Sequence, residues 1–149
     1  MMSEPQEIIL IGKNELVGRV AEFFAEGYRL VQICCTTLKD SYELNYSFDK
    51  DYHFKNLRIT VAPDEEIPSI TAVYHNAFLY ENEIHDLFGL SVKHIAVDYH
   101  GTLFRIAISK PFSIENVKLP EPPPPQPEES KQDTKVVTEH PDGQEPQKA

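Results

Sequence analysis

Three carboxylates stand within six positions of one another in residues 80–90, which read Tyr-Glu-Asn-Glu-Ile-His-Asp-Leu-Phe-Gly-Leu. At about 100° per residue on a helix, Glu83 and Asp86 lie about 60° apart and share a face, whereas Glu81 and Asp86 lie about 140° apart. Two carboxyl groups on one face suit a general acid and base, but they equally suit hydrogen bonds to an arginine of a partner. Spacing alone leaves both hypotheses open, together with a third in which the acids form a solvated helix face.

The position of these acids along the helix favours anchoring to a partner or to a neighbouring loop. They crowd the C-terminal half, where the helix macrodipole disfavours negative charge, and they alternate with Ile84, Leu87 and Phe88. Hydrogen-bond donors from a loop or from a partner would compensate for that placement.

A stand-alone hydrolase or isomerase is the competing enzymatic hypothesis. It would use Glu83 and Asp86 as acid and base, assisted by His85 or His100. Such chemistry needs a water-excluding cleft and a raised carboxyl pKa, neither of which a sequence displays.

The histidines and cysteines do not form a recognisable metal motif. The chain has six histidines: His53, His75, His85, His94, His100 and His140. None has a His-x-x-x-His or mixed Cys/His spacing, although His94 and His100 flank one loop. Cys34 and Cys35 are adjacent in a predicted strand and would point to opposite faces. We therefore expect reduced, packing thiols and no metal site.

Composition bounds the partners. The chain has 149 residues and a formal net charge of −10, so nucleic acid and anionic lipid, which reward a basic patch, are not expected partners, and proteins are. The longest aliphatic run, residues 8–11, is far shorter than the roughly 20 residues of a membrane span. The first residues also lack the basic and apolar regions of an export signal. These features predict a cytoplasmic protein without a span of its own.

The first elements predicted are a short strand over residues 7–11 and a helix. Apolar residues recur at helical spacing in Leu16, Val17, Val20, Ala21, Phe23 and Phe24. Asn14 is a plausible N-cap for this helix, and Gly27 is placed to end it.

Three strands follow, over residues 29–37, 42–48 and 54–62, joined by short polar connections that predict an antiparallel meander. Its middle strand alternates, with Leu44, Tyr46 and Phe48 predicted to face the core and Glu43, Asn45 and Ser47 predicted to face water. A helix packed on one face of such a sheet gives an α+β sandwich.

A second helical stretch is predicted to begin in residues 67–71, with Asn76 capping its final part and Gly89 as a left-handed stop. Residues 90–108 are irregular but apolar enough to belong to the body. We predict a domain over residues 1–114 and a Pro-rich, charged, disordered tail over residues 115–149, in which residues 120–127 form a polyproline II spacer.

The acidic segment resembles the signature of the complex I 30 kDa subunit family. Pro68 and Ser69 match its proline-serine pair, and an E-x-E-x-x-D-L-F-G motif follows. The matching positions of that motif are Glu81, Glu83, Asp86, Leu87, Phe88 and Gly89. Asn82 replaces the usual arginine of the respiratory members, and residues 93–105 lack their glycine-histidine-proline run. In both respects the chain is more similar to the homologous small subunits of energy-converting [NiFe] hydrogenases.

The resemblance implies a non-catalytic assembly subunit on the inner face of the cell membrane, in a complex that couples electron transport from ferredoxin or to protons with ion translocation. The implied partners are large and small hydrogenase or complex I subunits, a ferredoxin-like cluster subunit and integral membrane subunits. Those partners would carry the [NiFe] centre and the iron-sulfur clusters, and this chain would carry no cofactor, since two cysteines cannot supply the four ligands of a cluster. An NADH or F420H2:quinone dehydrogenase subunit is the alternative.

The resemblance also assigns roles to the motif residues. Glu81, Glu83 and Asp86 would anchor the helix end to backbone groups or to cations of a partner, Phe88 would fill the core or an interface, and Gly89 would form the turn.

Overall fold

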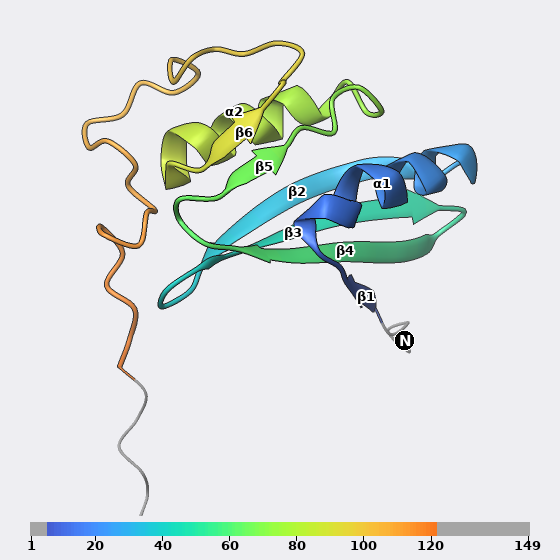
Figure 1. Cartoon of the computed structure of the whole chain (residues 1–149), viewed down its shortest axis with the longest axis horizontal. Helices are drawn as coiled ribbons and strands as arrows, with labels where there is room; N and C mark the ends of the chain where they lie inside the picture. Colours follow the sequence, from blue (N-terminus) through green and yellow to red (C-terminus); the bar gives the residue numbers. More distant parts are fainter. Residues whose placement is uncertain (1–5, 122–149) are drawn as a thin grey trace, which may run out of the picture.

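The computed structural model describes residues 6–121, and it confirms the predicted α+β class. Four strands form one sheet in the order β1-β4-β3-β2 (Figure 1). These strands are β1 (Glu7–Leu10), β2 (Arg29–Thr37), β3 (Tyr42–Lys50) and β4 (His53–Val61). The last three form the predicted antiparallel meander, whereas β1 pairs with β4 in parallel, so that the sheet is mixed.

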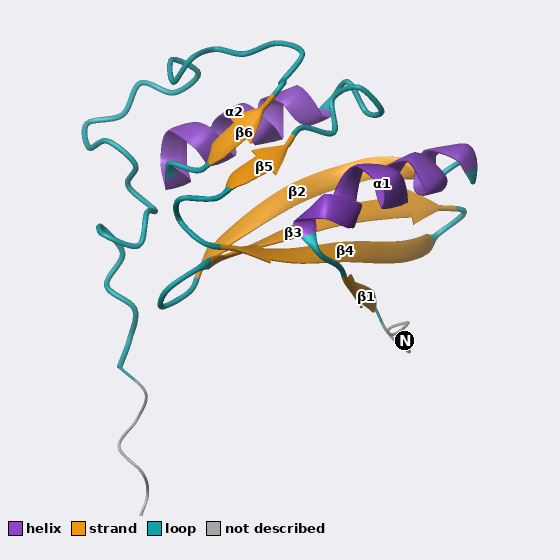
Figure 2. Cartoon of the chain, in the orientation of Figure 1, coloured by secondary structure: helices purple, strands orange, loops and turns teal. Residues whose placement is uncertain are grey.

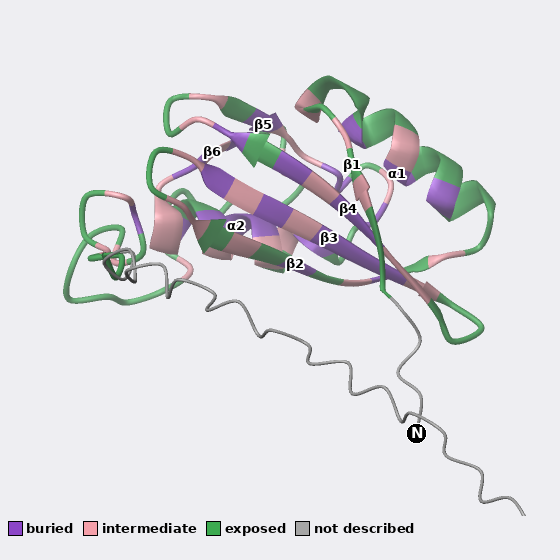
Figure 3. Cartoon of the chain, turned by 90° about the horizontal axis from the view of Figure 1, so that it is seen from below, coloured by how far each residue is buried: buried purple, intermediate pink, exposed green. Residues whose placement is uncertain are grey.

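Alternation in β3 divides the sheet into a core face and an open face. Leu44, Tyr46 and Phe48 are buried, as predicted. Ser47 was predicted to face water but is also buried, because its small side chain lies between its neighbours on the open face and donates a hydrogen bond to Oδ1 of Asn56 at 2.7 Å. The open face is the one toward the viewer in Figure 3.

Helix α1 (Leu16–Ala25) packs Leu16, Val20 and Phe23 into the core. The prediction that Asn14 caps it is wrong, because residues 13–15 form a 3₁₀ turn and the cap position falls on Glu15. The carboxylate of Glu15 instead accepts a hydrogen bond from the backbone N–H of Gly12 at 2.8 Å.

The helix α1 ends as predicted. Gly27 has φ +88°, a conformation that glycine adopts without a Cβ penalty, and its N–H donates to the carbonyl of Phe24. The chain then turns directly into β2.

The second helical region is shorter than predicted. Residues 67–71 do not begin a helix, because β5 (Glu66–Pro68) pairs in parallel with β6 (Ser91–Lys93), and α2 (Ala77–Phe88) connects the two. Asn76 stands at the N-cap of α2, but its side chain makes no capping hydrogen bond. Strand β5, helix α2 and strand β6 therefore form a small βαβ unit, an arrangement in which parallel strands need a crossover helix.

The core lies between the sheet and the elements on one of its sides. Rings of Phe23 on α1 and Tyr74 before α2 both contact Phe48 of β3, at centroid distances of 5.1 and 5.5 Å. Both helices and the β5–β6 pair accordingly lie on the same side of the four-stranded sheet (Figure 1). This is the two-layer packing expected for an α+β sandwich.

Residues 94–121 contain no helix or strand and run as a long connection past α2 (Figure 2). Most of the predicted tail, residues 122–149, lies outside the described part of the chain. Within residues 6–121, neither helix has the length and hydropathy that crossing a membrane requires.

Candidate functional site

The side chain of Glu81 ties α2 to the segment that follows β5. It is 1% exposed, and it accepts hydrogen bonds from the hydroxyl of Ser69 at 2.6 Å and from the N–H of Ile70 at 2.8 Å. Burial raises the pKa of Glu81, and the bonds from Ser69 and Ile70 oppose that rise. The predicted loop anchor is thus placed against backbone and hydroxyl donors of its own chain.

A relay of hydroxyl groups extends this anchor toward β6. Because the hydroxyl of Ser69 donates to Glu81, the 2.6 Å contact between Ser69 and Thr71 is a donation from Thr71. The oxygen of Thr71 then accepts the N–H of Ala96 at 2.9 Å. One buried carboxylate therefore orders two segments of the chain.

Asn82 holds the next stretch of that segment. Its side chain is 1% exposed, donates to the carbonyls of Phe78 at 2.7 Å and Val97 at 2.8 Å, and accepts the N–H of Tyr99 at 2.9 Å. From the sequence, Asn82 is recognisable only as a departure from the family motif, because nothing in the sequence indicates which backbone groups its side chain contacts.

Asp86 makes the third attachment. Its carboxylate accepts the N–H of Phe104 at 3.0 Å and lies 3.2 Å from Nδ1 of His85. The Asp86 side chain is 1% exposed, so its lone pairs are directed at these donors and away from bulk water. Asn82 and Asp86 together fix residues 97–104 against α2.

The end of α2 is closed by apolar and backbone contacts. Phe88 is half-buried between the rings of Tyr42 and Phe112, at 6.2 and 5.5 Å, and the carbonyl of Leu87 accepts the N–H of Phe112. Gly89 has φ +79°, as predicted for a left-handed stop.

Two motif residues remain. Pro68 ends β5, in register with Lys93 of β6. Glu83 has a different environment from the acids Glu81 and Asp86. Glu83 is half-buried and lines a hollow of about 460 Å³, and no hydrogen bond or ion pair of its carboxylate occurs within residues 6–121. Asp86 lines another, smaller hollow with His85 and Gly101. The structure does not bring Glu83 and Asp86 into one cleft, as an acid and base pair would require.

The segment that these anchors position is unusually apolar for a surface. We call residues 94–119 the docking segment. Its exposed large apolar side chains are Val97, Tyr99, Phe104, Ile106, Ile108, Phe112 and Leu119. Exposed apolar side chains concentrated in one segment make it a candidate interaction surface, since large exposed apolar patches usually mark interaction sites.

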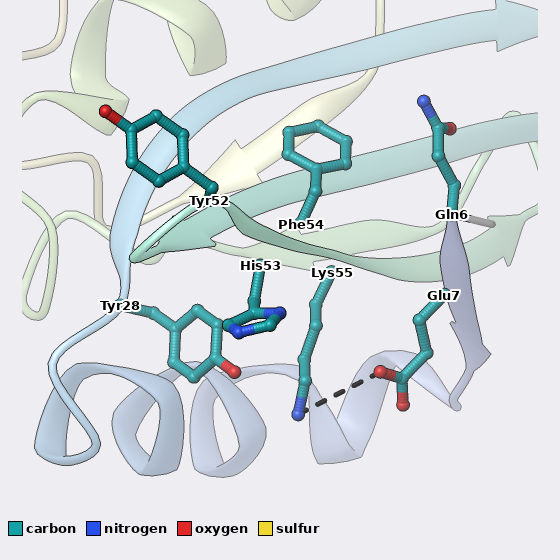
Figure 4. A pocket seen from close by; sticks show the side chains of 7 residues that line it. All are labelled: Gln6, Glu7, Tyr28, Tyr52, His53, Phe54 and Lys55. Carbon is teal, nitrogen blue, oxygen red and sulfur yellow. Dashed lines mark ion pairs between the residues drawn. The ribbon is translucent and has the colours of Figure 1, made fainter. Parts of the chain in front are cut away.

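A second surface region, at the β3–β4 hairpin, has its charges already paired. A hollow of about 420 Å³ there is lined by Gln6, Glu7, Tyr28, Tyr52, His53, Phe54 and Lys55. Figure 4 shows Tyr52 and Phe54 on one side of the strand and Lys55 reaching Glu7 on the other, 4.0 Å apart. The same ammonium group lies 5.3 Å from the ring centre of Tyr28. Because the carboxylate of Glu7 and the ammonium group of Lys55 pair with each other, this hollow does not present an unpaired charge of either residue to a ligand.

The thiols point to opposite faces of the sheet, as the strand alternation predicted, but the prediction that both pack against the core is wrong for Cys34, which is exposed. Cys34 is exposed on the open face of the sheet, and Cys35 packs against the core, where burial, with a smaller effect of Cys34, raises its pKa to about 12. Within residues 6–121, no three His, Cys, Asp or Glu side chains are grouped so that they could hold a metal ion.

Comparison with known proteins gives a family and a fold. The family model described as "Respiratory-chain NADH dehydrogenase, 30 Kd subunit" matches residues 11–112. A search of curated protein sequences gave no match. A chain of the membrane-bound sulfane sulfur reductase, an archaeal respiratory membrane complex, has a TM-score of 0.66 and 14% identity, over 80% of this chain and 76% of that chain. That level of identity shows a shared fold alone.

Proposed function

The chain belongs to the family of the 30 kDa subunit of respiratory-chain NADH dehydrogenase, and from this membership we propose that it is a non-catalytic subunit that docks to partner proteins in a respiratory membrane complex. Its contribution is assembly and rigidity, so that cofactors carried by its partners keep a fixed spacing.

The docking segment is the observation that supports this proposal. Seven of its large apolar side chains are between 38% and 62% exposed, and its backbone is hydrogen-bonded to the side chains of Thr71, Asn82 and Asp86. A segment that is already ordered pays less conformational entropy on binding than a free loop. An ordered, exposed apolar surface suits a protein partner better than a small substrate.

We further propose that the complex is an energy-converting [NiFe] hydrogenase. Asn82 stands where the respiratory members usually have arginine, and this asparagine is buried against the docking segment. The partners would then be large and small hydrogenase subunits, a ferredoxin-like cluster subunit and integral membrane subunits, with the chain on the cytoplasmic face. They would carry the [NiFe] centre and the clusters. The quinone dehydrogenase branch is the alternative.

The test is affinity purification of the tagged chain from membranes in mild detergent, with mass spectrometry of the co-purifying proteins and a hydrogen uptake assay. A nickel-binding large subunit with uptake activity supports the hydrogenase. Co-purification of quinone dehydrogenase subunits, or of a sulfur reductase, would refute the hydrogenase assignment but would still support the docking role. A solitary protein in the soluble fraction would refute the docking role itself.

A matched pair of variants tests the surface. Ile108 is 62% exposed on the docking segment, and Tyr52 is 94% exposed at the hairpin between β3 and β4. Ile108→Ser should lower the yield of co-purified partners while leaving thermal unfolding unchanged, and Tyr52→Ser should change neither. Equal yields for both variants would count against the docking segment.

A further inference from the structure

We propose that the hollow beside Glu83 receives an arginine side chain of a partner subunit, with the carboxylate of Glu83 as its counter-charge. This inference rests on the proposed docking function and adds the chemistry of the partner's contact. We call this site the Glu83 hollow.

One stripe of α2 and two residues of the docking segment form its walls. The lining residues are Asn76, Leu79, Tyr80, Glu83, Leu103 and Phe104. The first four stand at i, i+3, i+4 and i+7, which places them on one side of a helix. The docking segment runs past α2 (Figure 2), and its residues Leu103 and Phe104 also line the hollow. The volume of about 460 Å³ is large enough for a side chain to enter.

Both walls are held in place by hydrogen bonds from outside the hollow. The hydroxyl of Tyr80 donates to the carbonyl of Val31 on β2 at 3.1 Å, which fixes the aromatic wall. The N–H of Phe104 donates to Asp86 at 3.0 Å, which fixes the other side. The shape is therefore preorganised, and an entering side chain need not order it.

Charge distinguishes this hollow from other apolar surface. Among the lining residues, Glu83 is the single member of the acidic and basic residue types Asp, Glu, Lys and Arg, and within the described part of the chain its carboxylate has no base as a partner. The other two motif acids are bonded to backbone and hydroxyl donors, so they are not available to a partner. A half-buried carboxylate between apolar groups attracts a cation more strongly than an exposed one, because the local dielectric constant is lower.

The walls favour arginine over lysine. Leu79 and Phe104 are 49% and 40% exposed, so an entering side chain would cover apolar and aromatic surface. A guanidinium group is planar, more weakly hydrated than an ammonium group, stacks on aromatic rings and bonds a carboxylate through two parallel N–H groups. A strongly hydrated ammonium group gains less in the same surroundings.

The experiment combines a photo-cross-linker with charge variants in the full-length tagged chain, purified from membranes. p-Benzoylphenylalanine replaces Leu79 at the rim of the hollow, and mass spectrometry identifies the cross-linked partner peptide. In separate strains, Glu83→Gln and Glu83→Arg are compared with Glu26→Gln, a matched control at an exposed glutamate after α1. Retention of the partner is measured across a series of NaCl concentrations.

We expect a cross-linked peptide that contains arginine, about tenfold weaker retention for Glu83→Gln, stronger loss for Glu83→Arg, and no change for Glu26→Gln. Mutating the partner's arginine to glutamate should restore retention in Glu83→Arg. Unfolding temperatures of the Glu83 variants should match the wild type, because no internal bond is removed.

Three outcomes would overturn the inference. The first is a cross-linked partner peptide without arginine, or a cross-link to a second copy of this chain. The second is equal retention for Glu83→Gln and Glu26→Gln in a complex that still assembles, which would refute the hollow but leave the docking function standing. The third is a loss of retention and of stability in Arg105→Gln equal to that in Glu83→Gln, which would assign Glu83 to the exposed Arg105 of its own chain.

Discussion

Replacing Glu81 with alanine should destabilise the isolated protein by about 3 kcal/mol at neutral pH. The change removes the acceptor of two hydrogen bonds, from Ser69 at 2.6 Å and from the N–H of Ile70 at 2.8 Å. Ile70 is fully buried, so its N–H would lose its partner without gaining water. An unsatisfied buried donor costs about 1–3 kcal/mol, and the lost bond to Ser69 adds about 1–2 kcal/mol.

Glu81→Gln separates shape from charge. The amide keeps an oxygen that can accept from Ile70, and its NH₂ group can donate to Ser69, whose hydroxyl is then free to donate to Thr71. We therefore expect this variant to lose less than about 1 kcal/mol. Urea denaturation, followed by circular dichroism, measures both variants.

Comparing wild type with Glu81→Gln also tests how the stability contributed by Glu81 changes with pH. Burial raises the pKa of Glu81 above its ordinary value of 4.5, so the folded protein favours the unionised acid. That stabilising contribution is fully present below pH 4.5 and is lost as pH rises through the raised folded pKa, because the folded state then binds more protons than the unfolded state. Since glutamine has no proton to lose, the stability of wild type minus that of Glu81→Gln should fall as pH rises above 4.5.

Two results would refute this reasoning about Glu81. A loss below about 1 kcal/mol for Glu81→Ala would mean that water or another acceptor replaces the carboxylate. A stability difference between wild type and Glu81→Gln that grows as pH rises toward 4.5 and stays level above it would mean that the hydrogen bonds, rather than burial, determine the pKa of Glu81.

Three further substitutions test the other anchors. Asn82→Ala removes the acceptor of the Tyr99 N–H, so hydrogen exchange at that amide should accelerate about tenfold while exchange in β3 stays unchanged; equal acceleration in both would indicate global destabilisation instead. Gly89→Ala should lower the free energy of unfolding by about 1–2 kcal/mol, because Gly89 has φ +79°. The new Cβ would lie 2.5 Å from Cδ of Lys110, but adding Lys110→Ala should not restore the lost stability, since the strain is in the backbone. Phe88→Ala should lower the free energy of unfolding, measured by thermal unfolding, by about 2 kcal/mol. This value lies between the loss of about 3–5 kcal/mol for a fully buried phenylalanine and about 0.5 kcal/mol for an exposed one, because the ring is half-buried.

The meander was predictable because its strands are long and alternate. Each of β2, β3 and β4 has nine residues, enough for the period of two to stand out, and the middle strand buries Leu44, Tyr46 and Phe48 as expected. Gly27 and Gly89 were predictable as helix ends because glycine is the residue that adopts positive φ most readily.

Strands β5 and β6 were not predictable, because each has three residues and their pairing is parallel. A three-residue run shows no period, and Pro68 reads more readily as a helix start than as a strand end. Their contact exists only once α2 has brought residues 91–93 back beside residues 66–68. The cap assigned to Asn14 failed for a related reason, since the 3₁₀ turn at residues 13–15 moves the N-cap of α1 by one position, to Glu15.

The three acids show what a helical wheel cannot predict. A helical wheel places Glu83 beside Asp86 and apart from Glu81, but it says nothing of what packs above each position. In the structure Glu81 meets the segment after β5, and Asp86 meets residues 101–104. Glu83 lines a hollow, and within residues 6–121 its carboxylate has no hydrogen-bond or ion-pair partner. The acids that share a face on the wheel therefore differ in role, whereas the two that the wheel separates act alike.

This division leads to a test of the whole assignment. If Glu81 and Asp86 act within the chain, Glu81→Ala and Asp86→Ala should lower the unfolding temperature of the isolated protein and, as a consequence, its incorporation into the complex. If Glu83 acts between chains, Glu83→Gln should lower incorporation alone. Plotting incorporation against unfolding temperature for these variants should put the first two on the line defined by core variants such as Leu44→Ala, with Glu83→Gln below it. A Glu83 variant on that line would make all three acids internal anchors, and the partner's contacts would then depend on the docking segment alone.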